Sequence, residues 1–149
     1  MKAVIDEKIP YLRDALVAMG VEVIALPGDA ISNLHLVDAQ ALFVRTRTRC
    51  DAALLAGTAV RFIGTATIGY DHIDASYCNE NGIVWTNAAG CNAAAVLQYV
   101  QSVIYEWNRC LEGLAIGVVG VGEIGSRVAD WAAQVGMVVY RNDPPKADK

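Results

Sequence analysis

Residues 114–143, LAIGVVGVGEIGSRVADWAAQVGMVVYRND, decide the fold of this chain. Within them Gly120, Gly122 and Gly125 keep G-x-G-x-x-G spacing, between an apolar strand pattern and a helical pattern. The spacing has a physical reason. The first glycine permits a tight turn, the second lets a pyrophosphate approach the backbone, and the third lets the helix pack closely on the strand. This arrangement predicts a βαβ dinucleotide-binding unit.

The residues that flank the glycine loop fit the same interpretation. The helix that begins at Glu123 and Ile124 offers N–H groups and the positive end of its dipole to phosphates. Asp143 follows the second strand, about 20 residues after the loop, where a carboxylate can accept hydrogen bonds from ribose hydroxyls. The same carboxylate would repel the 2′-phosphate of NADP, so the sequence predicts NAD. The alternative is a tight structural turn that binds no cofactor.

The part of the chain before the glycine loop alternates between short apolar strands and short helical patterns. The predicted strands are residues 2–6, 21–26, 41–45, 60–66 and 83–86, and the predicted helices are residues 10–20, 31–39, 52–57 and 71–82. Continuous apolar strands that alternate with helices indicate a parallel sheet covered on both faces. The pattern therefore predicts a flavodoxin-like α/β domain over residues 1–90.

A longer helix separates the two parts. It is predicted from a cap at Asn92 to Leu111, and a helix of about 20 residues spans about 30 Å, which suits a connector between domains. Apolar side chains recur along it with helical spacing. They are Val96, Tyr99, Val100, Val103, Ile104 and Trp107. We therefore expect these six to form one packed stripe.

Composition excludes several classes of protein. The chain has 149 residues, a formal net charge of −4 and 54% hydrophobic residues. An acidic chain argues against a nucleic-acid partner, and no apolar run is as long as a membrane span. The four cysteines form no C-x-x-C pair, so neither a metal site nor a disulfide framework is expected, and free thiols suit a reducing cytosol. We expect a cytoplasmic protein without metal, membrane or nucleic-acid partner.

Several stretches carry a resemblance to a known family. They are VRTRT (44–48), FIGTATIGYDHID (62–74), GCNAAAVLQYV (90–100), GVVGVGEIGSRV (117–128) and DPPKAD (143–148). Together they resemble the D-2-hydroxyacid dehydrogenases. The resemblance implies a flavodoxin-like substrate domain (1–90), a linking helix (91–112) and the start of an NAD-binding Rossmann domain (113–149). It also implies a homodimer in the complete enzyme. GTAT, GCNA and DPP point to a branch that oxidises a phosphorylated D-2-hydroxy acid.

The resemblance also assigns substrate-binding residues. In open α/β sheets, ligands bind beyond the carboxyl ends of the strands. RTRT follows the third predicted strand and TATIG ends the fourth, so both border one crevice. By resemblance, the hydroxyls of Thr46 and Thr67 bind the substrate, and the backbone N–H groups of Ile68 and Gly69 receive its carboxylate. We therefore expect a small anionic substrate at this edge.

Three arginines lie close together in this acidic chain, at positions 45, 47 and 49. We expect Arg45, which is nearest the strand, to face the substrate, with Arg47 and Arg49 adding attraction for an anion. The alternative is that the three arginines form a solvated surface strip.

No catalytic residue is assigned within the chain. The family uses an Arg, a Glu and a His, all placed later than residue 149, so we expect an incomplete and inactive N-terminal part of the enzyme. His35 is expected in a solvated surface helix, and His72 in a structural role near a helix cap. Two alternatives stay open: another D-2-hydroxy acid substrate such as 3-phosphoglycerate, or a non-catalytic binding or regulatory protein on the same fold.

Overall fold

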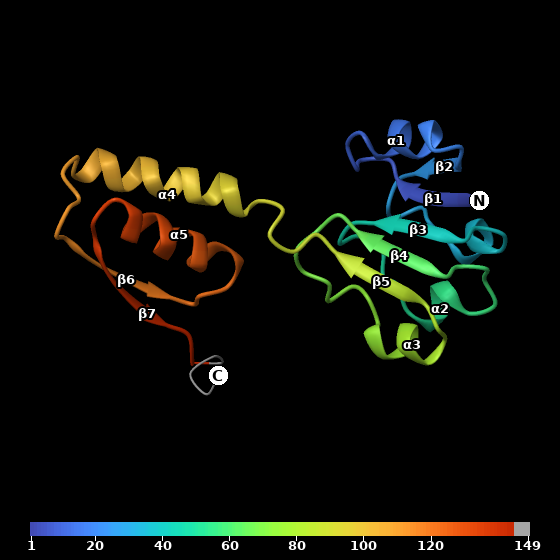
Figure 1. The fold of residues 1–149 in the computed structure, drawn as a ribbon. Helices are drawn as coiled ribbons and strands as arrows, with labels where there is room; N and C mark the ends of the chain where they lie inside the picture. Colours follow the sequence, from blue (N-terminus) through green and yellow to red (C-terminus); the bar gives the residue numbers. More distant parts are fainter. Residues whose placement is uncertain (145–149) are drawn as a thin grey trace. The chain divides into compact units, whose positions relative to one another are not determined.

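The structure is a computed structural model that describes residues 1–144. It divides into two compact units, Met1–Ala89 and Gly90–Lys149 (Figure 1). Each unit is an α/β structure whose strands are all parallel, which confirms the predicted fold class.

The first unit contains a five-stranded sheet in the order β2-β1-β3-β4-β5, which is the flavodoxin-like order. The strands are β1 (Lys2–Asp6), β2 (Glu22–Leu26), β3 (Ala41–Val44), β4 (Phe62–Thr65) and β5 (Val84–Asn87). The last residues of three neighbouring strands are in register, since Val44 pairs with Thr65 and Thr65 with Asn87. The loops that follow these strands therefore leave the sheet at one edge.

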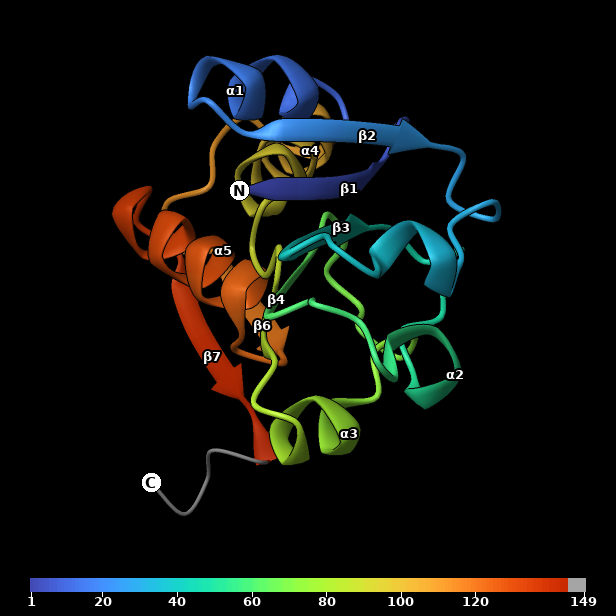
Figure 2. The ribbon, with the colours of Figure 1, turned by 90° about the vertical axis from the view of Figure 1, so that its right-hand side faces the viewer.

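Short helices cover both faces of this sheet. They are α1 (Leu12–Ala18), the 3-10 helix η1 (Asn33–Leu36), α2 (Ala52–Leu55) and α3 (Ala75–Glu80). Helix α1 lies beside β1 and β2 in both views of the ribbon (Figures 1 and 2). Asp51 caps α2 as predicted, because its side chain accepts hydrogen bonds from the N–H groups of Ala53 and Leu54.

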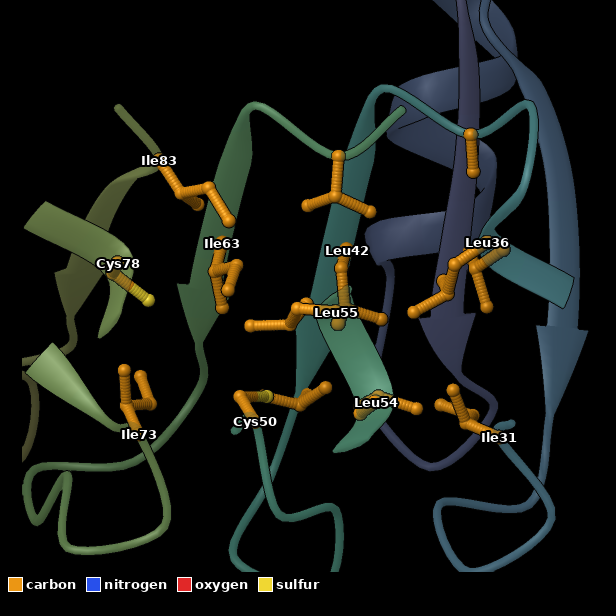
Figure 3. Close-up of a cluster of buried hydrophobic side chains, with 14 residues drawn as sticks. Ile31, Leu36, Leu42, Cys50, Leu54, Leu55, Ile63, Ile73, Cys78 and Ile83 are labelled. Carbon is orange, nitrogen blue, oxygen red and sulfur yellow. The ribbon is translucent and has the colours of Figure 1, made fainter. Parts of the chain in front are cut away.

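The core of the first unit follows from the period-two alternation of its strands. Leu42 and Ile63 point to one face, where they pack with residues of η1, α2 and α3 (Figure 3). Val4 of β1 belongs to the same cluster. Ala3 and Ala41 point to the other face, where they pack with α1. All five are at most 4% exposed, so the strands are buried on both faces.

The second unit contains two parallel strands and two helices. They are α4 (Ala93–Trp107), β6 (Ala115–Val119), α5 (Glu123–Gln134) and β7 (Val138–Asn142). Ile116 and Val139 of the strands pack with Leu97 of α4 and with apolar residues of α5. Within residues 1–144, no helix is both long enough and apolar enough to cross a bilayer.

Helix α4 differs from the prediction in its length and in its packed face. It ends at Trp107 rather than Leu111, because Asn108 is extended and its side chain accepts a hydrogen bond from the N–H of Cys110. Leu111 then lies buried in the core of the second unit. With 15 residues, α4 packs against α5 inside this unit.

The predicted apolar stripe of α4 divides into a side that packs in the core and a side that is exposed. Val100 and Ile104 pack into the core together with Leu97, whereas Tyr99 and Trp107 are 70% and 74% exposed. At about 100° per residue, the six predicted positions span an arc of about 140°, which is wider than the side of α4 that faces the core. An apolar pattern this wide therefore does not identify the buried side by itself.

Several other predicted boundaries shift. Helix α1 starts at Leu12 rather than residue 10, because Tyr11 has a left-handed backbone with φ 63°. The helix predicted over 31–39 is only the short η1, and α3 starts at Ala75, after the cap Asp74. Strand β3 ends at Val44, and β4 spans 62–65. Residues 71–73 therefore belong to the loop between β4 and α3.

Candidate functional site

The carboxyl edge of the five-stranded sheet carries a cavity of about 370 Å³. It is lined by residues of two loops that are far apart in sequence. Thr46 and Arg49 come from the loop after β3, and Gly69, Asp71 and His72 come from the loop after β4. The parallel topology brings the two loops together, because both follow strand ends that are in register.

The backbone of the loop after β4 is held through its carbonyl groups. The carbonyl of Thr67 accepts from the N–H of Ala88 (3.0 Å), and that of Ile68 accepts from the Asn87 side-chain amide (2.7 Å). The carbonyl of Gly69 accepts from the Thr67 hydroxyl (2.9 Å). Three consecutive carbonyl oxygens are thus bound by protein donors.

In the same loop, two backbone N–H groups have no hydrogen-bond acceptor among the described residues. Within residues 1–144, no protein acceptor meets the N–H of Ile68 or Gly69. Ile68 is 44% exposed, and Gly69 is exposed and lines the cavity. Two consecutive N–H groups without protein acceptors can both donate to an anion, so they form an anion-binding site.

His72, two residues before the cap of α3, is joined to this loop by a chain of hydrogen bonds. Its Nε2 lies 2.9 Å from the Thr65 hydroxyl, which lies 2.7 Å from the Thr67 hydroxyl. Its carbonyl accepts from the N–H of Cys50 (2.7 Å). Burial lowers the pKa of the His72 imidazole, and the nearby Asp71 carboxylate only partly opposes this. Sequence analysis placed His72 only near a helix cap, because its bond to Thr65 depends on how the loop folds back on the strand end.

The three arginines occupy different environments. Arg45 donates from Nε to the carboxylate of Asp6 (3.0 Å), which is fully buried. Arg49 lines the cavity, is 83% exposed at its side chain and pairs with Asp51 (2.9 Å). Arg47 is exposed. They do not form one strip, because the extended geometry that would align them ends at the last residue of β3.

The glycine loop of the second unit has the geometry its spacing requires. Gly120 has φ +85°, a conformation that favours glycine, and its N–H donates to the carbonyl of Asn142 (2.7 Å). A Cβ at Gly125 would collide with the carbonyl oxygen of Gly120. At Gly122, a Cβ would meet nothing within 4 Å. The loop therefore leaves open space at Gly122, where a pyrophosphate would approach.

Asp143 lies beside this loop. Its carboxylate accepts a hydrogen bond from the N–H of Val121 (3.0 Å). At the start of α5, the Glu123 carboxylate is against Gly90, and Ile124 packs into the core of the unit. As the first two residues of α5, Glu123 and Ile124 have N–H groups without partners inside the helix, and these can donate to a phosphate. A helix N-terminus, an open glycine loop and a carboxylate at the strand end fit a dinucleotide.

Part of the DPPKAD stretch that contributed to the resemblance lies outside the described residues, from position 145 onward. Sequence analysis did not assign to this site Asp71 and His72, which line the cavity, or Thr65, which is buried and hydrogen-bonded to His72. For Thr65 there was one local indication of a role at the site: it is a polar residue at the last position of a buried strand.

Comparison with known proteins gives consistent results. The family model for the D-isomer specific 2-hydroxyacid dehydrogenase catalytic domain matches residues 1–140. Erythronate-4-phosphate dehydrogenase of Bacteroides fragilis is 50% identical over 153 aligned positions, which cover 100% of this chain and 44% of that protein. The enzyme of the same name from Shigella flexneri is 42% identical and is covered over 40% of its length. The chain thus spans less than half the length of the curated relatives it matches.

Among solved structures, the NAD+-bound 3-phosphoglycerate dehydrogenase of Entamoeba histolytica is similar with a TM-score of 0.70. It is 27% identical, and the match covers 100% of this chain and 56% of that one. The similarity includes both units of the chain.

Proposed function

The chain belongs to the D-isomer specific 2-hydroxyacid dehydrogenase family, and on that premise we propose that it contributes substrate and NAD binding to an enzyme that oxidises 4-phospho-D-erythronate. The product is the corresponding 2-oxo acid, a step of vitamin B6 biosynthesis. The relatives that carry the name erythronate-4-phosphate dehydrogenase support this substrate. In this proposal residues 1–90 bind substrate, residues 91–112 link the two parts, and residues 113–149 begin the NAD-binding domain.

One observation carries the substrate site: the loop after β4 has bound carbonyl groups and available N–H groups beside the cavity. In the proposal, the N–H groups of Ile68 and Gly69 donate to the substrate carboxylate. The hydroxyls of Thr46 and Thr67 donate to its other anionic oxygens. Arg49 attracts the doubly anionic ligand, and the Asp71 carboxylate suits a ligand that also carries hydroxyl groups.

Arg45 has a different role from its neighbours. Its Nε donates to the buried Asp6, so only its other N–H groups are available to substrate. Replacing Arg45 would leave a buried carboxylate without its ion pair, which destabilises the fold as well as any ligand contact. Arg45→Met therefore cannot test substrate binding unless stability is measured at the same time.

NAD, when bound, would supply the hydride acceptor that oxidation of a 2-hydroxy acid needs. The N–H groups at Gly122, Glu123 and Ile124 donate to its pyrophosphate, Gly120 and Gly125 shape the loop, and Asp143 accepts from the ribose hydroxyls. The family's catalytic Arg, Glu and His are expected beyond residue 149. The proposal is therefore that the 149-residue chain alone has no dehydrogenase turnover, and that the complete enzyme is a homodimer.

The substrate proposal is tested in the complete enzyme with Thr46→Val, which keeps the shape of the side chain and removes the hydroxyl. We expect affinity for 4-phospho-D-erythronate to fall by about tenfold or more, because a hydrogen bond to a charged group is lost. Affinity for NAD should not change. Thr58→Val, in the turn between α2 and β4, removes another hydroxyl and serves as the control.

Isothermal titration with substrate and with NAD measures both affinities. Equal substrate affinity in the wild type and Thr46→Val would remove Thr46 from the site. Faster oxidation of 3-phospho-D-glycerate than of 4-phospho-D-erythronate would overturn the substrate assignment.

The cofactor proposal is tested with Asp143→Ala. Loss of the carboxylate should weaken NAD binding and relax the preference over NADP, because both the ribose hydrogen bonds and the repulsion of the 2′-phosphate disappear. Titration of the complete enzyme with each cofactor measures this. Tighter binding of NADP than NAD by the wild type would show that the assignment is wrong.

A further inference from the structure

The hydrogen bonds that connect His72, Thr65, Thr67 and Gly69 have one possible direction. The Gly69 carbonyl can only accept, so the single hydroxyl proton of Thr67 is donated to it (2.9 Å). Thr67 must then accept from the hydroxyl of Thr65 (2.7 Å). Thr65, whose proton is used in this way, must accept from Nε2 of His72 (2.9 Å). Nε2 of His72 therefore carries a proton.

The chain of hydrogen bonds is buried at Thr65 and becomes more exposed toward both ends. Thr65 is only 4% exposed, so the middle of the chain is shielded from competing water. His72 and Gly69, at the two ends, both line the cavity. His72 is itself held in place, because its carbonyl accepts from the N–H of Cys50 and the next residue, Ile73, pairs with Cys50.

From this geometry we infer that His72 and Thr65 are positioning residues that make the Thr67 hydroxyl a fixed donor toward the carboxylate-binding loop. The inference rests on the proposed function, in which the substrate carboxylate lies at Ile68 and Gly69. A substrate oxygen that replaces the Gly69 carbonyl as acceptor leaves the order of donors unchanged. Only the Thr67 O–H then turns from the Gly69 carbonyl to the anion, while the protons of Thr65 and His72 stay on the same atoms.

The first experiment measures the direction of the chain and does not depend on any substrate. Nitrogen-15 spectra of the complete enzyme, with labelled histidine, distinguish a protonated Nε2 from a protonated Nδ1 at neutral pH. We expect neutral His72 with its proton on Nε2. A proton on Nδ1 would mean that Nε2 accepts from Thr65, and this would overturn the inference whatever the substrate is.

The second experiment distinguishes the effect of the Thr65 hydroxyl from the effect of the packing of its side chain. Thr65→Val keeps the shape and removes the hydroxyl, whereas Thr65→Ser keeps the hydroxyl and removes a methyl group. If Thr65 positions Thr67, KM for 4-phospho-D-erythronate should rise about fivefold in Thr65→Val and stay within about twofold in Thr65→Ser. In both variants, KM for NAD should be unchanged. A merely structural role predicts the reverse order of the two variants.

A double-mutant cycle with Thr67→Val closes the test. If Thr65 acts through the Thr67 hydroxyl, adding Thr65→Val to Thr67→Val should raise KM no further. Additive effects would show that Thr65 acts independently and would overturn the inference. A complete enzyme that does not oxidise 4-phospho-D-erythronate, yet shows the Nε2 proton, would contradict the proposed function and leave the hydrogen-bond direction intact.

Discussion

In the first unit helices lie on both faces of the sheet, whereas in the second unit both helices pack on the same face. Val4 and Ile5 are neighbours on β1 that point to opposite faces, and they are 0% and 1% exposed. On β6, Val118 is 8% exposed, but the next residue, Val119, is 82% exposed. Tyr140 of β7 is 66% exposed. Parallel strands bury both faces only where helices cover both, which holds for the first unit among the described residues.

The two units also build their sites differently. In the second unit the glycine loop is one contiguous stretch, held by hydrogen bonds to Asn142 and Asp143 at the end of the paired strand. In the first unit the cavity needs two loops and a chain of side chains that are brought together by strand register. The comparison indicates that a contiguous site can be identified from sequence, whereas a site built by tertiary contacts needs the fold.

The largest expected difference between the units is in hydrogen exchange. Amides of the central strands β1 and β3 should exchange at least about a hundredfold more slowly than those of β6 and β7, because β1 and β3 are buried and paired on both edges. Exchange of the 149-residue chain, followed by NMR or mass spectrometry, measures this. Equal exchange rates in the two sheets would show that the two units do not differ in local stability.

A pair of truncations tests the same contrast at single residues. Leu42→Ala, at a 0% exposed position in the larger core, should lower the free energy of unfolding by about 2–5 kcal/mol because it leaves a cavity. Val119→Ala, at an 82% exposed position, should change it by less than about 0.5 kcal/mol. Urea denaturation gives both values. A large loss at Val119 would mean that this face of β6 is covered in solution.

The glycine loop provides a matched pair within the second unit. Gly125→Ala should weaken NAD binding of the complete enzyme by about tenfold or more, since the new Cβ would collide with Gly120 and displace the loop. Gly117→Ala, where a Cβ would meet nothing within 4 Å, should leave NAD affinity unchanged. Titration with NAD compares the two variants. Equal binding by both would indicate that the loop does not hold the cofactor.

The smallest expected effect is a pH dependence that belongs to the first unit. Because the pKa of His72 is lowered from 6.5, the unfolded chain takes up a proton more readily than the folded one. Stability should therefore be constant above pH 6.5 as far as His72 is concerned, and should decrease as the pH falls below it. Urea midpoints across this range, compared with those of His72→Gln, isolate the contribution. An identical pH profile in the variant would contradict the lowered pKa.

Much of the fold could be predicted from local patterns. Apolar strands that alternate with short helices indicated a parallel α/β sheet, and the structure confirms it. The Asp51 cap was also predictable, because the carboxylate and the N–H groups it binds are only two and three residues apart. Patterns of this kind need no knowledge of distant contacts.

The ends and faces of helices could not be predicted in the same way. Asn108 has an extended backbone after α4, and Tyr11 has a left-handed backbone before α1. Residue type alone does not decide between these conformations and one more residue of helix. For α4, the apolar residues cover more than the buried side of the helix, and only packing against α5 distinguishes Val100 and Ile104 from Tyr99.

By itself, the sequence determined the sheet type and the glycine loop, because both follow from residues that are close together along the chain. Only the tertiary structure decided that Arg45 pairs with buried Asp6, that Arg49 rather than Arg45 lines the cavity, and that His72 is joined to Thr65. The physical reason is that hydrogen bonds and ion pairs act over about 3 Å, so side chains far apart in sequence interact only after strand register has brought them together.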